Sequence, residues 1–235
     1  MGVLARAPRY VTAAPLFVPT DIAGLELWFD ASDSATITHS SNLVSQWNDK
    51  SGNARHVSNG ANQPTTNTVT IGGLNAIAFD ASDVLTRGSV TLDTTALTFF
   101  GVVDSGGSHR SFFTSKGGGG IGFTTNGDGS GGLGLIFPGV ATEDTATANN
   151  NALVFLCRRT GGTATVYVNG GTSVMTSTAT PGAGFNDIYV GKDASGAANE
   201  NLGEILWYSS ALSTADLNSA GQYLATKWGL SWTSI

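Results

Sequence analysis

Short apolar runs separated by turn residues constrain the fold of this chain of 235 residues more than any other feature. Gly, Asn, Asp and Ser interrupt the runs at short spacing, which is typical of an all-β sandwich or barrel. We predict strands at 25–29, 43–47, 76–79, 97–103, 111–114, 120–124, 132–137, 153–158, 163–168, 188–191 and 203–208. The fold class is therefore predicted to be all-β.

One pentapeptide occurs twice, each time directly after such a run. Phe-Asp-Ala-Ser-Asp spans residues 29–33 and again residues 79–83. Asp and Ser side chains can hydrogen-bond the backbone where a strand stops pairing, so each copy predicts an acidic turn at a strand end. The residues after the two copies differ and no third copy follows, which excludes a solenoid of repeats.

A single helix is predicted at residues 214–228. Ser213 and Asp216 form a capping box at its start, and Gly229 stops it. Apolar residues recur at helical spacing up to Trp228, so we expect this helix to lie on the sandwich with Trp228 in the core.

Two further segments are predicted to be turns. Asn169-Gly170 supplies the positive φ angles of a tight hairpin turn within 166–174. The glycine-rich segment 116–134 resembles a phosphate loop only in composition, because no Gly-Lys-Ser/Thr motif occurs in it. We expect it to form hairpins and a flexible surface loop.

The first 21 residues form a predicted attachment arm, separate from one domain at 22–235. Three prolines in the arm disfavour regular strand pairing and interrupt the apolar stretch that an export signal or a membrane span would need. The arm carries two arginines and no acid before Asp21. Its predicted partner-binding residues are Arg6, Arg9, Tyr10, Leu16 and Phe17.

Composition excludes several classes of function. Charged residues make up 12% of the chain and the net charge is −6, which argues against nucleic-acid binding. The single cysteine, Cys157, provides no disulfide framework, and we expect it to be a small buried apolar residue. We predict no membrane segment.

No catalytic motif is evident, and the chain is predicted not to be an enzyme. Retaining glycosidases need two carboxyl groups close together, and none of the four Glu residues of this chain lies in a strand motif of closely alternating acids. Glu204 is interpreted as a framework residue. The three His residues, His39, His56 and His109, lie far apart and suggest no zinc site.

Calcium is the inorganic ligand that the residues fit best. Asp30, Asp33, Asp80 and Asp83 offer the hard oxygen ligands that calcium prefers. The spacing of an EF-hand is absent, and Asp at strand ends commonly serves the backbone. No metal or other cofactor is therefore the favoured prediction, with calcium as the alternative.

Several segments resemble one family when they are taken together and in order. They are Leu27 to Asp33, Val44 to Asn53, Ala78 to Asp80, Gly203 to Tyr208, Leu212-Ser213 and Tyr223 to Gly229. This combination resembles the laminin-G-like branch of the concanavalin A-like lectin/glucanase superfamily. The resemblance implies a two-sheet antiparallel jelly roll with one C-terminal helix, and core positions for Trp28, Trp47, Phe79 and Trp228. It names no activity, because the family includes glycan-binding, adhesion, enzymatic and phage virion proteins.

A lectin-like fold without an export signal or disulfides favours a phage virion protein, assembled in the host cytoplasm and released by lysis. We expect a non-enzymatic capsid decoration or head/tail-fibre component at the virion surface. It would be multicopy or homo-oligomeric, attached to other virion proteins by its arm, with host-surface glycans as further ligands. The alternative is a carbohydrate-binding or adhesion module of a secreted bacterial protein, extracellular or at the cell surface. A divergent glycosidase is the third hypothesis.

Overall fold

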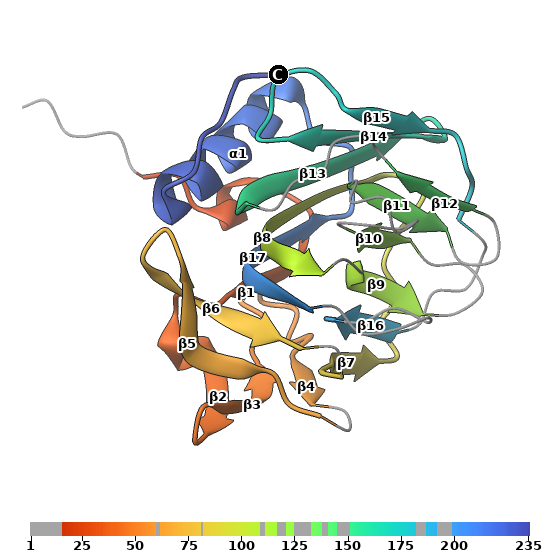
Figure 1. The fold of residues 1–235 in the computed structure, drawn as a ribbon. Coiled ribbons are helices and arrows are strands. Elements are labelled where there is room, and N and C mark those ends of the chain that lie inside the picture. The colour runs from red at the N-terminus through yellow and green to blue at the C-terminus, as the bar shows by residue number, and fades with distance from the viewer. Residues whose placement is uncertain are drawn as a thin grey trace, which may run out of the picture.

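A computed structural model describes residues 16–59, 62–80, 82–108, 111–116, 121–124, 133–137, 141–144, 151–181, 187–191 and 199–235. The named strands pair in antiparallel fashion, and one α-helix follows them near the C-terminus (Figure 1). The predicted all-β class with a C-terminal helix is therefore confirmed. None of the helices in the described ranges is long and apolar enough to cross a membrane.

One group of strands is centred on β8 and β17. Its members are β1 (Leu25–Asp30), β5 (Thr65–Ile71), β6 (Leu74–Phe79), β8 (Leu97–Ser108), β13 (Leu153–Thr160), β14 (Thr163–Val168), β15 (Met175–Ser177) and β17 (Asn199–Tyr208). They run in the order β15-β14-β13-β8-β17. The first half of β17 then pairs with β6, and its second half pairs with β1.

The second group runs in the order β2-β3-β4-β7-β16-β9-β10-β11-β12. Its members are β2 (Ile37–Ser40), β3 (Leu43–Trp47), β4 (Val57–Asn59), β7 (Leu85–Gly88), β16 (Asp187–Val190), β9 (Ser111–Lys116), β10 (Gly122–Thr124), β11 (Gly134–Phe137) and β12 (Ala141–Asp144). Pairing of Leu43 with Thr65 joins β3 to β5, so one nearly closed sheet contains both groups. Two short 3₁₀ turns, Pro19–Asp21 and Ser34–Thr36, flank β1 and β2.

Aromatic side chains from the two groups meet in the core. Phe99 of β8 stacks on Phe123 of β10 with ring centroids 3.9 Å apart, and it lies 5.2 Å from Phe113 of β9. Trp207 of β17 lies 5.7 Å from Phe113. All four rings are fully buried, so the apolar core lies between the two groups of strands.

The helix α1 (Thr214–Trp228) has the predicted bounds and lies along β8 and β13 (Figure 1). The side chain of Ser213 accepts a hydrogen bond from the backbone N–H of Asp216, at 3.2 Å. Gly229 ends the helix with a left-handed φ of 64°. Trp228 is fully buried, as predicted.

The C-terminus is held against both α1 and the loop after β14. The backbone N–H of Thr233 donates to Asn169, and that of Gly171 donates to Thr233. Asn169 and Gly170 have the predicted positive φ angles, 53° and 74°. The loop is longer than a two-residue turn, because β15 starts only at Met175 and the tail pairs with Gly170.

Trp232, in the C-terminal tail, is held by contacts with α1 and the core. Its indole N–H donates to the side chain of Asn218 at 3.1 Å, and its ring lies 6.3 Å from that of Phe100. The ring also lies against Gly221 of α1, where an added Cβ would come within 2.3 Å of indole carbons.

Gly221→Ala therefore tests this packing. In an open helix the change would stabilise the protein by about 0.4–1 kcal/mol. Here we expect it to lower the free energy of unfolding by about 1–3 kcal/mol, because the new methyl group overlaps the Trp232 ring. Ser219→Ala on the exposed face of α1 is the control and should change stability by less than about 0.5 kcal/mol. Urea denaturation measures both, and a stabilised Gly221→Ala protein would contradict the packing.

Candidate functional site

A buried polar network of the described residues includes Glu204, on β17, as its main hydrogen-bond acceptor. Its side chain is fully buried, and its two oxygens accept four hydrogen bonds. The donors are Trp28 Nε1 at 2.7 Å, Tyr223 Oη at 3.0 Å, Lys227 Nζ at 2.7 Å and Trp228 Nε1 at 2.8 Å. Three of these donors belong to α1 and one belongs to β1, so Glu204 ties both elements to the centre of the sheet.

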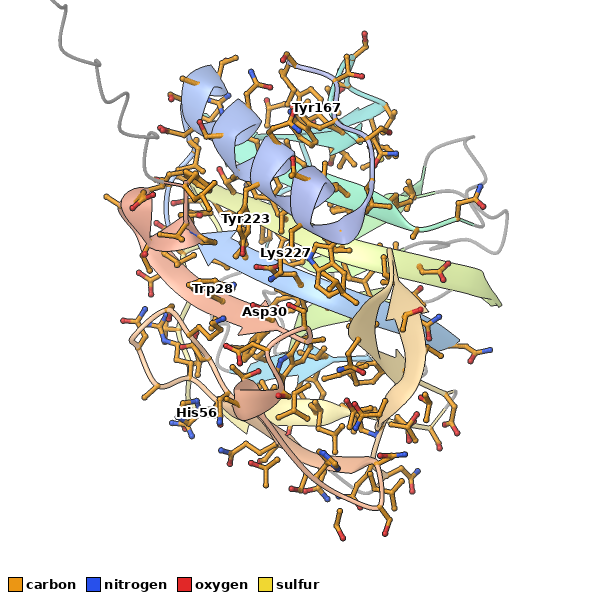
Figure 2. The ribbon with its side chains drawn as sticks, turned by 90° about the vertical axis from the view of Figure 1, so that its left-hand side faces the viewer. Trp28, Asp30, His56, Tyr167, Tyr223 and Lys227 are labelled. Carbon is orange, nitrogen blue, oxygen red and sulfur yellow. The ribbon has the colours of Figure 1, made fainter. Side chains whose placement is uncertain are left out.

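Lys227 of α1 connects Glu204 to Asp30 in the first Phe-Asp-Ala-Ser-Asp turn, and Figure 2 labels both Lys227 and Asp30. Its Nζ lies 2.7 Å from Asp30 and 2.7 Å from Glu204. Lys50 then lies between the two acids of the turn, 2.9 Å from Asp30 and 2.8 Å from Asp33. The Lys50 ammonium also lies 4.4 Å above the ring of Trp28. Two lysines thus pair with three carboxylates within one cluster.

The two buried acids of this cluster have pKa values displaced in opposite directions. Burial favours a higher pKa for Asp30, but the charge of Lys227 and hydrogen bonds from Lys227, Ser32 and Lys50 outweigh burial and lower it. Burial raises the pKa of Glu204, the charge of Asp30 adds to this, and Lys227 and Trp228 only partly oppose it. Burial and the nearby Glu204 also raise the pKa of Tyr223.

The pair Asp30 and Glu204 has the spacing of a catalytic pair but not the access that one needs. Their oxygens bind the same ammonium, so they lie no further apart than twice 2.7 Å, close to the roughly 5–5.5 Å of retaining glycosidases. However, Glu204 is fully buried and all its acceptor directions are occupied by protein donors. In this arrangement its role is to hold α1 on the sheet, in agreement with its interpretation as a framework residue.

The polar turn after β3 supports the same cluster. Asp49 Oδ1 accepts hydrogen bonds from the backbone of Trp28 at 3.0 Å and of Ser51 at 2.9 Å. His56 accepts a hydrogen bond from the backbone of Asp49 at 3.0 Å, so this histidine has a structural role. The sequence analysis included this segment in the family resemblance but missed that the Lys50 side chain reaches Asp30.

The second Phe-Asp-Ala-Ser-Asp copy makes the same turn in different surroundings. Asp80 Oδ1 accepts from the backbone and hydroxyl of Ser82, both at 2.9 Å, just as Asp30 does from Ser32. Asp83 Oδ2 accepts from the backbone of Asp80 at 3.0 Å. In the described part of the chain, however, no basic side chain pairs with Asp80 or Asp83.

Instead, the second copy borders a hollow of about 220 Å³ where β6 ends and β17 begins. Its described lining consists of Thr65, Ala78, Phe79, Asp80, Asp83, Asn199 and Asn201. Burial raises the pKa of Asp83, the backbone N–H of Asp80 opposes this, and the charge of Asp80 adds to it. Sequence reasoning identified both acids but had no means of finding the two asparagines, which lie more than a hundred residues further along the chain.

The calcium candidates therefore divide into two pairs that the fold keeps apart. Asp30 and Asp33 are occupied by lysines, and a divalent cation there would have to displace Lys50. Across the described ranges, no group of three or more His, Cys, Asp or Glu side chains gathers around a point that could hold a metal. Cys157 is fully buried, and burial raises its pKa to about 12, so it stays an un-ionised thiol.

Of the predicted partner-binding residues, only Leu16 and Phe17 lie within the described part of the chain. Arg6, Arg9 and Tyr10 fall outside the described residues, as does His109. Leu16 is 91% exposed, and the ring of Phe17 packs edge-on against Tyr223 with centroids 5.7 Å apart. Binding of partners through the arm stays a prediction.

Comparison with known proteins gives structural likeness only. No family model and no curated protein sequence matches the chain. A sialidase of Trypanosoma rangeli in complex with sialic acid is similar over 88% of this chain and 34% of its own, with TM-score 0.58 and 12% identity. An arabinofuranosidase complexed with arabinofuranosyl-α-1,2-xylobiose is similar over 79% of this chain and 51% of its own, with TM-score 0.61 and 10% identity. The chain thus spans about a third of the sialidase and about half of the arabinofuranosidase.

These likenesses correct two expectations. The chain was expected to be a phage virion structural protein and not an enzyme, but the similar structures are glycosidases, including a mutant sialidase that displays trans-sialidase activity. The virion and non-enzyme expectations are therefore overturned, while identities of 10–14% show a shared fold only. The resemblance to laminin-G-like domains was not tested by these matches and stays a prediction.

Glu204→Gln should destabilise the protein by roughly 3–5 kcal/mol. The new amide group places two hydrogen-bond donors where Glu204 now accepts from indole, phenol and ammonium donors. Glu26→Gln is the matched control, because Glu26 pairs with Arg55 at the surface and should contribute less than about 1 kcal/mol. Chemical denaturation distinguishes the two, and equal small losses would show that Glu204 is not central.

The pH dependence of stability should contain a term from Asp30. Its pKa in the folded protein lies below the ordinary 3.8, so its stabilising effect is present above that value and is lost as pH falls through the folded pKa. We expect the difference in unfolding free energy between the wild type and Asp30→Asn to be greatest near neutral pH and to shrink below about pH 4. A difference that stays constant into acid would contradict this.

Proposed function

We propose that this chain is a glycan-binding domain of a carbohydrate-active protein of the glycoside-hydrolase kind. The observation that carries the proposal is the shared fold with two different sorts of glycosidase over most of this chain. The identities of 10–14% support a common fold and no shared reaction. Glycan binding is the property that a sialidase and an arabinofuranosidase have in common.

The finer architecture belongs to the same proposal. We interpret the two facing groups of strands as the two sheets of a concanavalin A-like jelly-roll sandwich, with α1 on the outer side of β8 and β13. The concave edges and end loops of such sandwiches are suited to polar ligands. With the virion function overturned, the extracellular or cell-surface location is the one that fits this proposal.

Hydrolysis by this domain itself is the second candidate, favoured by the glycosidase neighbours. It requires two carboxyl groups that face one open cleft. The Asp30 and Glu204 pair is closed to substrate, whereas Asp80 and Asp83 both border the hollow near β6. Hydrolysis would therefore depend on the second pair of acids.

The test measures binding and turnover on the same purified protein. An array of neutral and sialylated glycans, followed by calorimetry, should give saturable binding of at least one class, and an unrelated β-domain of similar net charge is the control. Aryl sialosides and aryl arabinofuranosides then test turnover. Sugar release that is lost in Asp83→Asn would support the second candidate, whereas neither binding nor release would contradict the proposed function.

A further inference from the structure

We propose that the hollow beside the second Phe-Asp-Ala-Ser-Asp turn is the glycan site, and that it selects a neutral sugar unit over an acidic one such as sialic acid. This inference rests on the proposed glycan-binding function and specifies the place and the ligand class. Two observations carry it. One is the polar lining of the hollow, and the other is the contrast between the two copies of one motif.

The two copies of the motif share the hydrogen bonds within the turn but differ in the side chains around it. In both copies the first Asp accepts two hydrogen bonds from the Ser two positions later. The first copy is neutralised by Lys50 and Lys227 within a closed cluster. The second copy makes the same turn, but it borders the hollow together with the amide side chains of Asn199 and Asn201. Turn formation does not require these amides, so they are available for another role.

The lining offers the groups that recognise hydroxyls. Asp83 is 6% exposed and lines the hollow, and its Oδ2 accepts a hydrogen bond from the backbone of Asp80. Asn201 donates a long hydrogen bond of 3.4 Å to Asp104, so its carbonyl oxygen remains an acceptor. Asn199 adds a second amide, and Ala78 and Phe79 supply apolar surface. Carboxylates accept hydrogen bonds from sugar hydroxyls, and amides both accept and donate.

Size and charge then restrict the ligand. A volume of about 220 Å³ is below the roughly 300–1,000 Å³ of pockets for drug-sized ligands, which suits a single sugar ring. The described lining contains two Asp and no Lys or Arg. An acidic sugar would bring its carboxylate toward these acids without a cation to pair with it, at a cost in affinity. Neutral pentoses and hexoses avoid this cost.

Calorimetry and ligand-observed NMR test the inference with two probes, arabinofuranosyl-α-1,2-xylobiose and sialic acid. We expect the wild type to bind the neutral probe in preference to sialic acid. Asp83→Asn keeps the oxygen that accepts from Asp80 but removes the charge, and Asn199→Ala removes one amide. Asp83→Asn should weaken binding of the neutral probe by about tenfold or more, since it weakens hydrogen bonds to a charged group. Asn199→Ala should weaken it by about three- to tenfold, since it removes a neutral hydrogen-bond partner.

Asp33→Asn is the matched control, because it makes the same change at the same position of the first copy. It should leave affinity within about twofold, since Asp33 lies in the lysine-neutralised cluster. Melting curves verify that each variant is folded. Unchanged affinity in both Asp83→Asn and Asn199→Ala, or preference for sialic acid, would overturn the inference while leaving glycan binding by the domain intact.

Calcium binding in the hollow and the absence of any glycan ligand are two further outcomes that the experiments can give. If calcium raises the melting temperature of the wild type but not of Asp83→Asn, and EDTA abolishes sugar binding, the hollow is a cation site and the inference is wrong. If the broader glycan array yields no ligand of any class, the proposed function itself fails, and the inference falls with it.

Discussion

A single buried carboxylate, that of Glu204, ties the strands β17 and β1 to the helix α1. It lies on β17, the strand that pairs with β1, β6 and β8. Its four donors come from β1 and α1, and Lys227 extends the connection to Asp30. A buried charge is costly unless every acceptor direction is satisfied, so the position of the helix and the geometry of the first acidic turn depend on each other. Such a network favours one arrangement of α1 on the sheet over slightly shifted ones.

Local signals were sufficient for the helix and for most of the strands with strong apolar character. The cap residue Ser213 and the stop at Gly229 act through bonds within a few positions, so the bounds of α1 followed from sequence. The prediction missed β2, β4, β5, β7, β12 and β15, which are short or rich in Thr and Asn. For example, Thr65–Ile71 pairs with β6 and takes its burial from that partner. Strand formation there is decided by non-local pairing, which composition does not reveal.

The partners of the candidate-site acids also depend on residues that are remote along the chain. The acids Asp30, Asp33, Asp80 and Asp83 stood out in the sequence because they form two identical motifs. Their difference arises from partners that are remote along the chain: Lys227 reaches Asp30 from α1, whereas Asn199 and Asn201 line the hollow near Asp83 from β17. A short motif therefore predicts its own turn, and the charge balance around it depends on the tertiary fold. The same reasoning explains why a pair with catalytic spacing, Asp30 and Glu204, has a structural role here.

Absent sequence features are weaker evidence for the function of this chain than structural likeness is. The virion interpretation combined a lectin-like fold with the lack of an export signal and of disulfides, and so it rested mainly on absences. Structural likeness to a sialidase and an arabinofuranosidase is a positive observation, although it reports the fold and not the reaction. Specificity among proteins of one fold then has to come from side chains that face solvent, since buried core residues contact no ligand. In this chain the hollow beside Asp83 combines carboxylates and amides without a described basic residue, and under the proposed glycan-binding function that charge balance, more than the fold, would determine which sugars bind there.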